Sequence, residues 1–178
     1  MVKISPKPIL AISSCLLGEN VRYDGGNKRD SLIVDRLGEV FDFLPICPEV
    51  GIGLGVPRPP IQMVMIEHEI QLRGVSDPKL DVTGRMVTYA RENISICDQV
   101  CGYILKSKSP SCGINDVPVY NLNGVPIHTG PGMYAREILS RCSNLPLIDE
   151  DMLQDKMLRD EFMQRVSAHY VELHKQSM

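Results

Sequence analysis

The chain has 178 residues, enough for one domain with a single core, and its 43% hydrophobic and 23% charged residues are ordinary for a globular protein. It has no Trp and 5% aromatic residues, too few for the stacking platform of a single-strand nucleic-acid binder. The net charge of −3 gives no basic surface for a phosphate backbone or an anionic membrane, so a small-molecule partner is favoured.

Hydrophobic periodicity and turn residues predict strands alternating with helices along the chain. The first half is predicted to contain a strand at 8–14, a helix at 28–37, a strand at 40–46, a stiff non-helical loop at 45–60 and a hairpin with strands at 62–66 and 70–73. The second half is predicted to contain a helix from Thr83 to about Val100, a strand at 103–105, a hairpin around Asn123-Gly124, a helix from Gly132 to about Cys142, a strand at 146–148 and a helical extension over about 150–176. This order predicts one α/β domain over residues 1–178, with a doubly wound, mainly parallel sheet, helices on both faces and small hairpin insertions.

The location of the protein decides how its six cysteines are interpreted. The segment before Cys15 resembles a lipoprotein cleavage site, but its apolar stretch covers only residues 9–12, whereas a signal peptide needs roughly 7–15 apolar residues. No stretch is apolar enough to span a membrane. We therefore expect a cytoplasmic protein, in which cysteines are more often metal-binding or catalytic than paired in disulfides.

Three of the cysteines follow predicted strands. Cys15, Cys47 and Cys112 lie in the loops after the strands at 8–14, 40–46 and 103–105. Because ligands of open α/β sheets bind outside the carboxyl ends of the strands, these three thiols are predicted to meet at one edge. Each one alone is equally well explained as a small core residue. The other three cysteines, Cys97, Cys101 and Cys142, are expected to pack in the core.

The residues beside these cysteines add polar chemistry. A residue before proline is held extended, and in extended backbone alternate side chains share one side, so Cys47 and Glu49 are expected to face one pocket. Such a pair joins a soft metal ligand to a proton donor or acceptor. Lys106 and Lys108 are expected to lower the pKa of nearby thiols or to orient an anionic product.

Motifs for phosphate and nucleotide chemistry are incomplete. The glycine-rich segment 51–55 lacks the third glycine position of a dinucleotide fingerprint, and no helix is predicted after it. Cys15 and Arg22 nearly match a cysteine-phosphatase loop, but Val21 occupies the position at which that loop requires arginine. The Gly130-Pro131-Gly132 segment is predicted either to bind an anion at a helix start or to form a simple turn.

Six short motifs, taken together, resemble the thiouracil desulfurase family, which was long catalogued as a domain of unknown function. They are CLLG at 15–18, VRYDG at 21–25, CPEV at 47–50, GLGVPR at 53–58, DVT at 81–83 and KSKSPSCG at 106–113. The resemblance spans about residues 8–145. It implies a Rossmann-like α/β fold carrying a [4Fe–4S] cluster on Cys15, Cys47 and Cys112, with one iron free of protein ligands.

The resemblance also implies an activity: the non-redox conversion of a small thiocarbonyl compound, such as 2-thiouracil, to its carbonyl form and hydrosulfide. The thiocarbonyl sulfur would bind the open iron, because both are soft. A cluster with an open iron is expected to be lost from a sample prepared in air. The sequence indicates neither the physiological substrate nor the oligomeric state.

Further site residues follow from the resemblance. Glu49 maps to the acid or base that activates water, and Ser109, or after it Ser107, maps to a contributing serine. Asp24 and Ser111 are candidates for substrate contact, although Asp24 equally well caps the turn at Gly25. Two other functions stay open: a non-catalytic carrier of a cluster or of sulfur, and a metal-free enzyme that uses Cys15 or Cys112 as nucleophile.

Overall fold

The computed structural model describes residues 7–175. The two boundaries of the predicted domain, residues 1 and 178, lie outside the described residues, and so does residue 176, the last position of the predicted helical extension. The first half of the chain forms β1 (Ile9–Ser13), the 3₁₀ helix η1 (Ser14–Leu17), the π-helical segment η2 (Leu32–Arg36), the 3₁₀ helix η3 (Leu37–Glu39), β2 (Asp42–Ile46), α1 (Pro48–Gly51), β3 (Ile61–Ile66) and β4 (Glu69–Gly74). The second half forms α2 (Thr83–Glu92), the 3₁₀ helix η4 (Ile94–Asp98), β5 (Gly102–Leu105), β6 (Val117–Tyr120), β7 (Pro126–Gly130), α3 (Met133–Arg141), β8 (Leu147–Asp149), α4 (Glu150–Gln154) and α5 (Lys156–Lys175).

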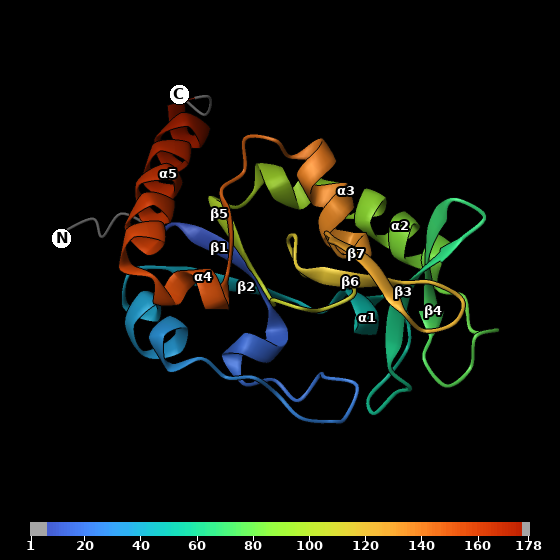
Figure 1. The fold of residues 1–178 in the computed structure, drawn as a ribbon. Helices are drawn as coiled ribbons and strands as arrows, with labels where there is room; N and C mark the ends of the chain where they lie inside the picture. The colour runs from blue at the N-terminus through green and yellow to red at the C-terminus, as the bar shows by residue number, and fades with distance from the viewer. Residues whose placement is uncertain (1–6, 176–178) are drawn as a thin grey trace, which may run out of the picture.

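Two four-stranded sheets organise these elements (Figure 1). The first has the order β2-β1-β5-β8, and all its neighbouring strands are parallel. The second has the order β4-β3-β6-β7 and joins the two predicted hairpins through a parallel pairing of β3 with β6. The predicted α/β class is confirmed, and the hairpins form a second sheet rather than separate small insertions.

The parallel sheet is covered on both faces, as predicted. Along β1 the side chains alternate, so that Leu10 and Ile12 pack against Phe162 and Val166 of α5. The larger core lies on the opposite face, where Ala11 packs with residues of α2, α3 and the second sheet. Figure 1 shows α5 at the outer side of the parallel sheet and α2 and α3 near the second sheet. Within residues 7–175, no helix has the length and apolar character needed to span a membrane.

Three predicted segments differ from the structure. The helix predicted from Thr83 to Val100 ends at Glu92, where the Asn93 side chain bonds to the Tyr89 carbonyl and a 3₁₀ turn follows. The helix predicted at 28–37 is reduced to η2 and η3, because the amides of Lys28 and Asp30 donate to carbonyls of the Cys15 segment instead. The loop predicted to be non-helical at 45–60 contains the single turn α1.

Gly102 allows α5 to lie close to β5. A Cβ atom at this position would lie 2.9 Å from Val166 Cγ2 and 3.2 Å from Phe162 Cζ. Gly102→Ala is therefore expected to lower the free energy of unfolding by about 1–3 kcal/mol through overpacking. Urea denaturation measures the change. Gly84→Ala in α2 is the matched control, because its Cβ meets no atom within 4 Å and should not destabilise the protein. Equal effects of the two variants would contradict the packing argument.

Cys97 and Cys142 form a disulfide, so the expectation that they are simple core residues is wrong. The chain brings η4 beside the end of α3, which places two cysteines 45 positions apart within a Cα–Cα distance of 6.1 Å. Cys101, by contrast, is a free thiol packed in the core as expected, with 3% of its surface exposed. The local pattern could not reveal the pairing, because it depends on how two distant helical segments dock.

Reduction of this disulfide is expected to lower the free energy of unfolding by about 2–4 kcal/mol, because the unfolded chain regains the freedom of the closed loop. Guanidinium denaturation with and without a reductant measures the difference. In the Cys97→Ala/Cys142→Ala double variant the reductant should have no effect. A wild-type curve that does not respond to the reductant would refute the prediction.

Candidate active site

A cavity of about 260 Å³ opens at the carboxyl ends of β1, β2 and β5. Its lining comes from segments 13–15, 21–23, 46–49 and 106–112, together with Lys28 and Arg58. In the order β2-β1-β5-β8 the direction of chain progression reverses between β1 and β5, and this switch point is where open parallel sheets bind ligands. The volume suits a small molecule rather than a polymer.

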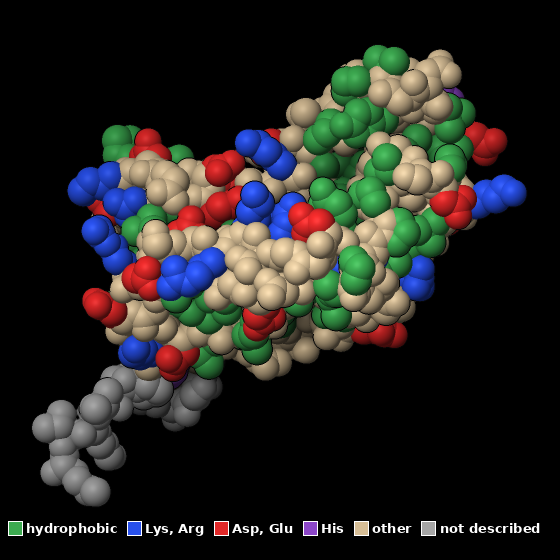
Figure 2. Space-filling view, turned by 90° about the horizontal axis from the view of Figure 1, so that it is seen from below, with side chains coloured by type: hydrophobic (Ala, Val, Ile, Leu, Met, Phe, Trp, Pro, Cys, Tyr) green, Lys and Arg blue, Asp and Glu red, His purple; other side chains and the backbone are tan. Residues whose placement is uncertain are grey.

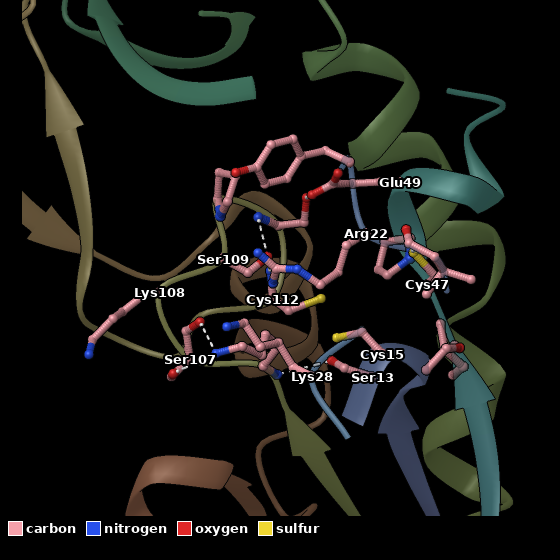
Figure 3. A pocket seen from close by; sticks show the side chains of 18 of the residues that line it. Ser13, Cys15, Arg22, Lys28, Cys47, Glu49, Ser107, Lys108, Ser109 and Cys112 are labelled. Carbon is pink, nitrogen blue, oxygen red and sulfur yellow. Dashed lines mark hydrogen bonds between the residues drawn. The ribbon is translucent and has the colours of Figure 1, made fainter. Parts of the chain in front are cut away.

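The three cysteines predicted to meet do line this one cavity. Cys15 lies in η1 directly after β1, Cys47 precedes α1 directly after β2, and Cys112 lies in the loop that follows β5. Figure 3 shows the sulfur atoms of Cys15 and Cys112 turned toward each other, with Cys47 to one side. All three are free thiols; Cys15 and Cys112 are buried and Cys47 is half-buried.

Burial sets the protonation of these thiols. Desolvation raises the pKa of Cys15 to about 11, and Arg22 and Lys106 only partly oppose it. Desolvation also raises the pKa of Cys47 and of Cys112. The charge of Lys106 thus lowers the pKa of Cys15, as expected, but desolvation outweighs it, and the pKa rises instead of falling. A thiol in such a place becomes a thiolate when a metal displaces its proton.

The donor set fits an iron–sulfur cluster better than a single ion. In the part of the chain that the structure describes, no three His, Cys, Asp or Glu side chains are grouped so as to hold one metal ion. A [4Fe–4S] cluster instead distributes its cysteine ligands over separate iron atoms, so it needs thiols that surround a space. Cys15, Cys47 and Cys112 line one cavity, and thiolates are the soft ligands that iron–sulfur clusters take.

Glu49 lines the same cavity, although not for the predicted reason. Cys47 is extended, but Pro48 then begins α1, so Glu49 lies on a helical turn rather than in extended backbone. Its Oε2 accepts a hydrogen bond from Arg58 Nε at 2.7 Å, and its Oε1 accepts one from Ser111 Oγ at 2.9 Å. The carboxylate is therefore oriented from two sides.

Arg58 is a site residue that the sequence analysis did not identify. Its side chain is 3% exposed, and its Nη1 donates to the Gly55 carbonyl at 2.8 Å while its Nε holds Glu49. The only signal in the sequence was its place in the GLGVPR motif. A buried arginine needs such acceptors, because an unpaired buried charge is strongly unfavourable.

The serines of the 106–112 loop have different partners. Ser109 Oγ accepts hydrogen bonds from the amides of Ser111 and Cys112 at 3.3 and 3.1 Å, which fixes the turn that presents Cys112. Ser111 is fully buried and donates to Glu49. Ser107 is also buried, and its hydroxyl donates to Glu150 at 2.7 Å. Glu150 is another residue that the sequence analysis did not identify.

Asp24 does not line the cavity. Its Oδ1 accepts a hydrogen bond from the Gly26 amide at 3.0 Å, and this bond lowers the pKa of the carboxyl group. The turn-capping role considered for it is the one that its contacts support. The neighbouring Arg22 lines the cavity instead.

The first amides of α3 bind the loop of residues 106–112, which we call the cysteine loop, so these amides are not open for an anion. The amides of Met133 and Tyr134 donate to the carbonyls of Pro110 and Ser111. Gly132 is required for this approach, since a Cβ there would lie 2.6 Å from the Ser111 carbonyl oxygen. The backbone on either side of Cys112 is therefore held by a helix end.

The cavity lining is positively charged. Its cations are Arg22, Lys28, Arg58, Lys106 and Lys108, and its single carboxylate is Glu49. Figure 2 shows Lys and Arg side chains gathered near the middle of the face seen from below, with acidic side chains beside them. Such a lining favours an anionic ligand.

Comparison with known proteins agrees with the family resemblance. The family model described as 2-thiouracil desulfurase matches residues 10–150. A solved structure, the [4Fe–4S]-dependent thiouracil desulfidase TudS, is 34% identical, with a TM-score of 0.64 over 88% of this chain and 99% of that one. No curated protein matches the sequence significantly.

Proposed function

The chain belongs to the 2-thiouracil desulfurase family, and on this basis we propose that it removes sulfur from a small thiocarbonyl compound such as 2-thiouracil. The proposed reaction is thiocarbonyl plus water giving carbonyl plus hydrosulfide and a proton, so no oxidant or reductant is consumed. The observation that carries the proposal is the arrangement of three free thiols and an arginine-paired carboxylate around one small cavity.

In the proposed site, Cys15, Cys47 and Cys112 hold a [4Fe–4S] cluster. When bound, its iron without a protein ligand would supply a Lewis-acid position for a soft sulfur atom. The chain itself binds the small substrate within a partly closed cavity and places its thiocarbonyl carbon near Glu49. A thiopyrimidine has the size that this cavity accepts.

Glu49 is the proposed general base. It takes a proton from the attacking water, the new carbon–oxygen bond forms, and the carbon–sulfur bond then breaks with its electron pair on sulfur. Arg58 holds one carboxylate oxygen and Ser111 the other, so the group is already oriented before the substrate binds. The cationic lining then favours hydrosulfide as the departing anion.

Ser109 is proposed as the serine that contacts the substrate. Its oxygen accepts hydrogen bonds from two backbone amides, and within residues 7–175 its hydroxyl proton has no acceptor, so this proton is available to a ligand. The Ser107 hydroxyl, by contrast, already donates to Glu150.

The two alternative functions account for less of the site. A carrier of clusters or sulfur needs thiols, but it does not need a carboxylate fixed by Arg58 and Ser111 in the same cavity. A metal-free thiol enzyme needs a thiol of lowered pKa, whereas burial raises the pKa of Cys15 and of Cys112.

Anaerobic reconstitution with iron and sulfide tests the proposal. The reconstituted protein is expected to release sulfide and uracil from 2-thiouracil in equal amounts over many turnovers. Iron uptake without sulfide release would favour the carrier. Equal activity with and without iron would favour the metal-free thiol enzyme.

A further inference from the structure

Glu150 contacts the first residues of the cysteine loop, although it follows Cys112 by 38 positions in the sequence. It is the first residue of α4, directly after β8, and its side chain is 11% exposed. Its Oε2 accepts the Ser107 amide at 2.7 Å, and its Oε1 accepts both the Ser107 hydroxyl at 2.7 Å and the Lys106 ammonium group. One buried carboxylate therefore holds two successive residues of the cavity lining.

The Lys106 ammonium group is fully engaged in this cluster. Besides Glu150, its Nζ donates to the carbonyl and to the hydroxyl oxygen of Ser107, each at 3.0 Å. A lysine ammonium group has three donors, so no proton of Nζ is left for a ligand. Its backbone amide is also fixed, by Ser13 Oγ at 3.0 Å, on the residue that ends β1.

We propose that Glu150 is a positioning residue of the active site: it locks Lys106 and Ser107 into one hydrogen-bonded cluster beneath the cysteine loop. In this cluster Lys106 serves as a fixed positive charge beside Cys15, and Ser107 anchors the loop rather than acting on the substrate. A charge that is held in place before the reaction stabilises developing negative charge without reorganisation. The functional part of this inference rests on the proposed desulfuration, whereas the geometric part does not.

The geometric part is tested on the reduced, metal-free protein by limited acetylation of lysines, read by mass spectrometry. Lys108, whose side chain is 73% exposed, is the internal reference. In the wild type Lys106 should be acetylated much more slowly than Lys108. In Glu150→Gln the ratio should rise several-fold, because the amide cannot hold the ammonium group as the carboxylate does. Asp160→Asn, which removes the same charge from a side chain 53% exposed on α5 that pairs with Lys156 and not with either measured lysine, should leave the ratio unchanged.

The functional part is tested on the reconstituted protein. Glu150→Gln is expected to lower kcat/KM for sulfide release from 2-thiouracil roughly 10–100-fold, the usual effect of losing a group that orients site residues. Because Glu150 acts partly through Lys106, the loss in the double variant Glu150→Gln/Lys106→Met should be clearly smaller than the product of the two single losses. A residue needed only for folding would instead give losses that multiply.

The outcomes separate this inference from the proposed function. An unchanged acetylation ratio overturns the inference whether or not the protein is active. A raised ratio with unchanged kcat/KM, or multiplying losses, also overturns it. If the wild type releases no sulfide, the proposed function fails, and the acetylation ratio alone decides whether Glu150 holds Lys106. Should Glu150→Gln fail to fold, Glu150→Asp, one methylene shorter, gives the same comparison.

Discussion

Replacing Cys47 by alanine is expected to abolish iron binding and sulfide release together. The proposed cluster has three protein ligands, and Cys47 supplies the one from the end of β2. Its thiol is half-buried, and its contact to the Val21 carbonyl is long at 3.9 Å, so its removal should leave the fold intact. Iron and acid-labile sulfide per chain, measured after anaerobic reconstitution, should both fall to background.

Cys101→Ala is the matched control for this variant. Cys101 is also a free cysteine, but it packs with Leu10 and Ile104 in the core outside the cavity. Its loss is expected to cost about 1 kcal/mol of stability and to leave iron content and turnover at wild-type levels. A Cys47→Ala protein that kept its iron would show that the cluster is bound elsewhere.

Glu49→Gln is expected to bind iron normally and to lose at least about 100-fold in kcat, because the amide cannot accept the proton from water. Glutamine has nearly the same shape, and its oxygen can still accept a hydrogen bond from Ser111 or Arg58. Iron content, the absorption spectrum of the reconstituted protein and the rate of sulfide release from 2-thiouracil separate the two properties.

Glu137→Gln is the control for the loss of a paired carboxylate. Glu137 on α3 is 12% exposed, close to the 13% of Glu49, and it is held by Arg91 and Arg141 away from the cavity lining. Its replacement should leave turnover unchanged. If both variants lost activity equally, the effect at Glu49 would be structural and its assignment as the general base would be wrong.

The positions of the three thiols were predictable from local sequence. Cys47 directly follows a run of apolar residues, Cys15 follows one after two serines, and parallel strands place their carboxyl ends at one edge of the sheet. Cys112 was harder, since it lies seven residues after the end of β5 and reaches the cavity through a loop fixed by Ser109 and the start of α3. The predicted roles of Glu49, Ser109 and Ser111 came from the family resemblance, and they remain predictions.

The partners of these residues were not predictable. Arg58 lies in a loop whose path hydrophobic periodicity does not predict, and it contacts Glu49 from there. Glu150 contacts Ser107 from the start of α4, directly after the last strand of the parallel sheet. Asp24, predicted to contact the substrate, caps its own turn through the Gly26 amide, and its Oδ1 lies 3.7 Å from Nε of Arg22, which lines the cavity. The pairs Arg58–Glu49 and Glu150–Ser107 each join polar side chains from different elements, which only the packed fold brings together.

The sequence by itself determined the α/β class, the order of its elements and the edge of the sheet at which the thiols lie. These features depend on which face of a helix or strand is buried, and hydrophobic periodicity records that locally. Only the tertiary structure decided the second sheet, the Cys97–Cys142 disulfide and the pairs Glu49–Arg58 and Lys106–Glu150. Each of these joins separate segments, so it exists only once the core has packed and fixed their distance.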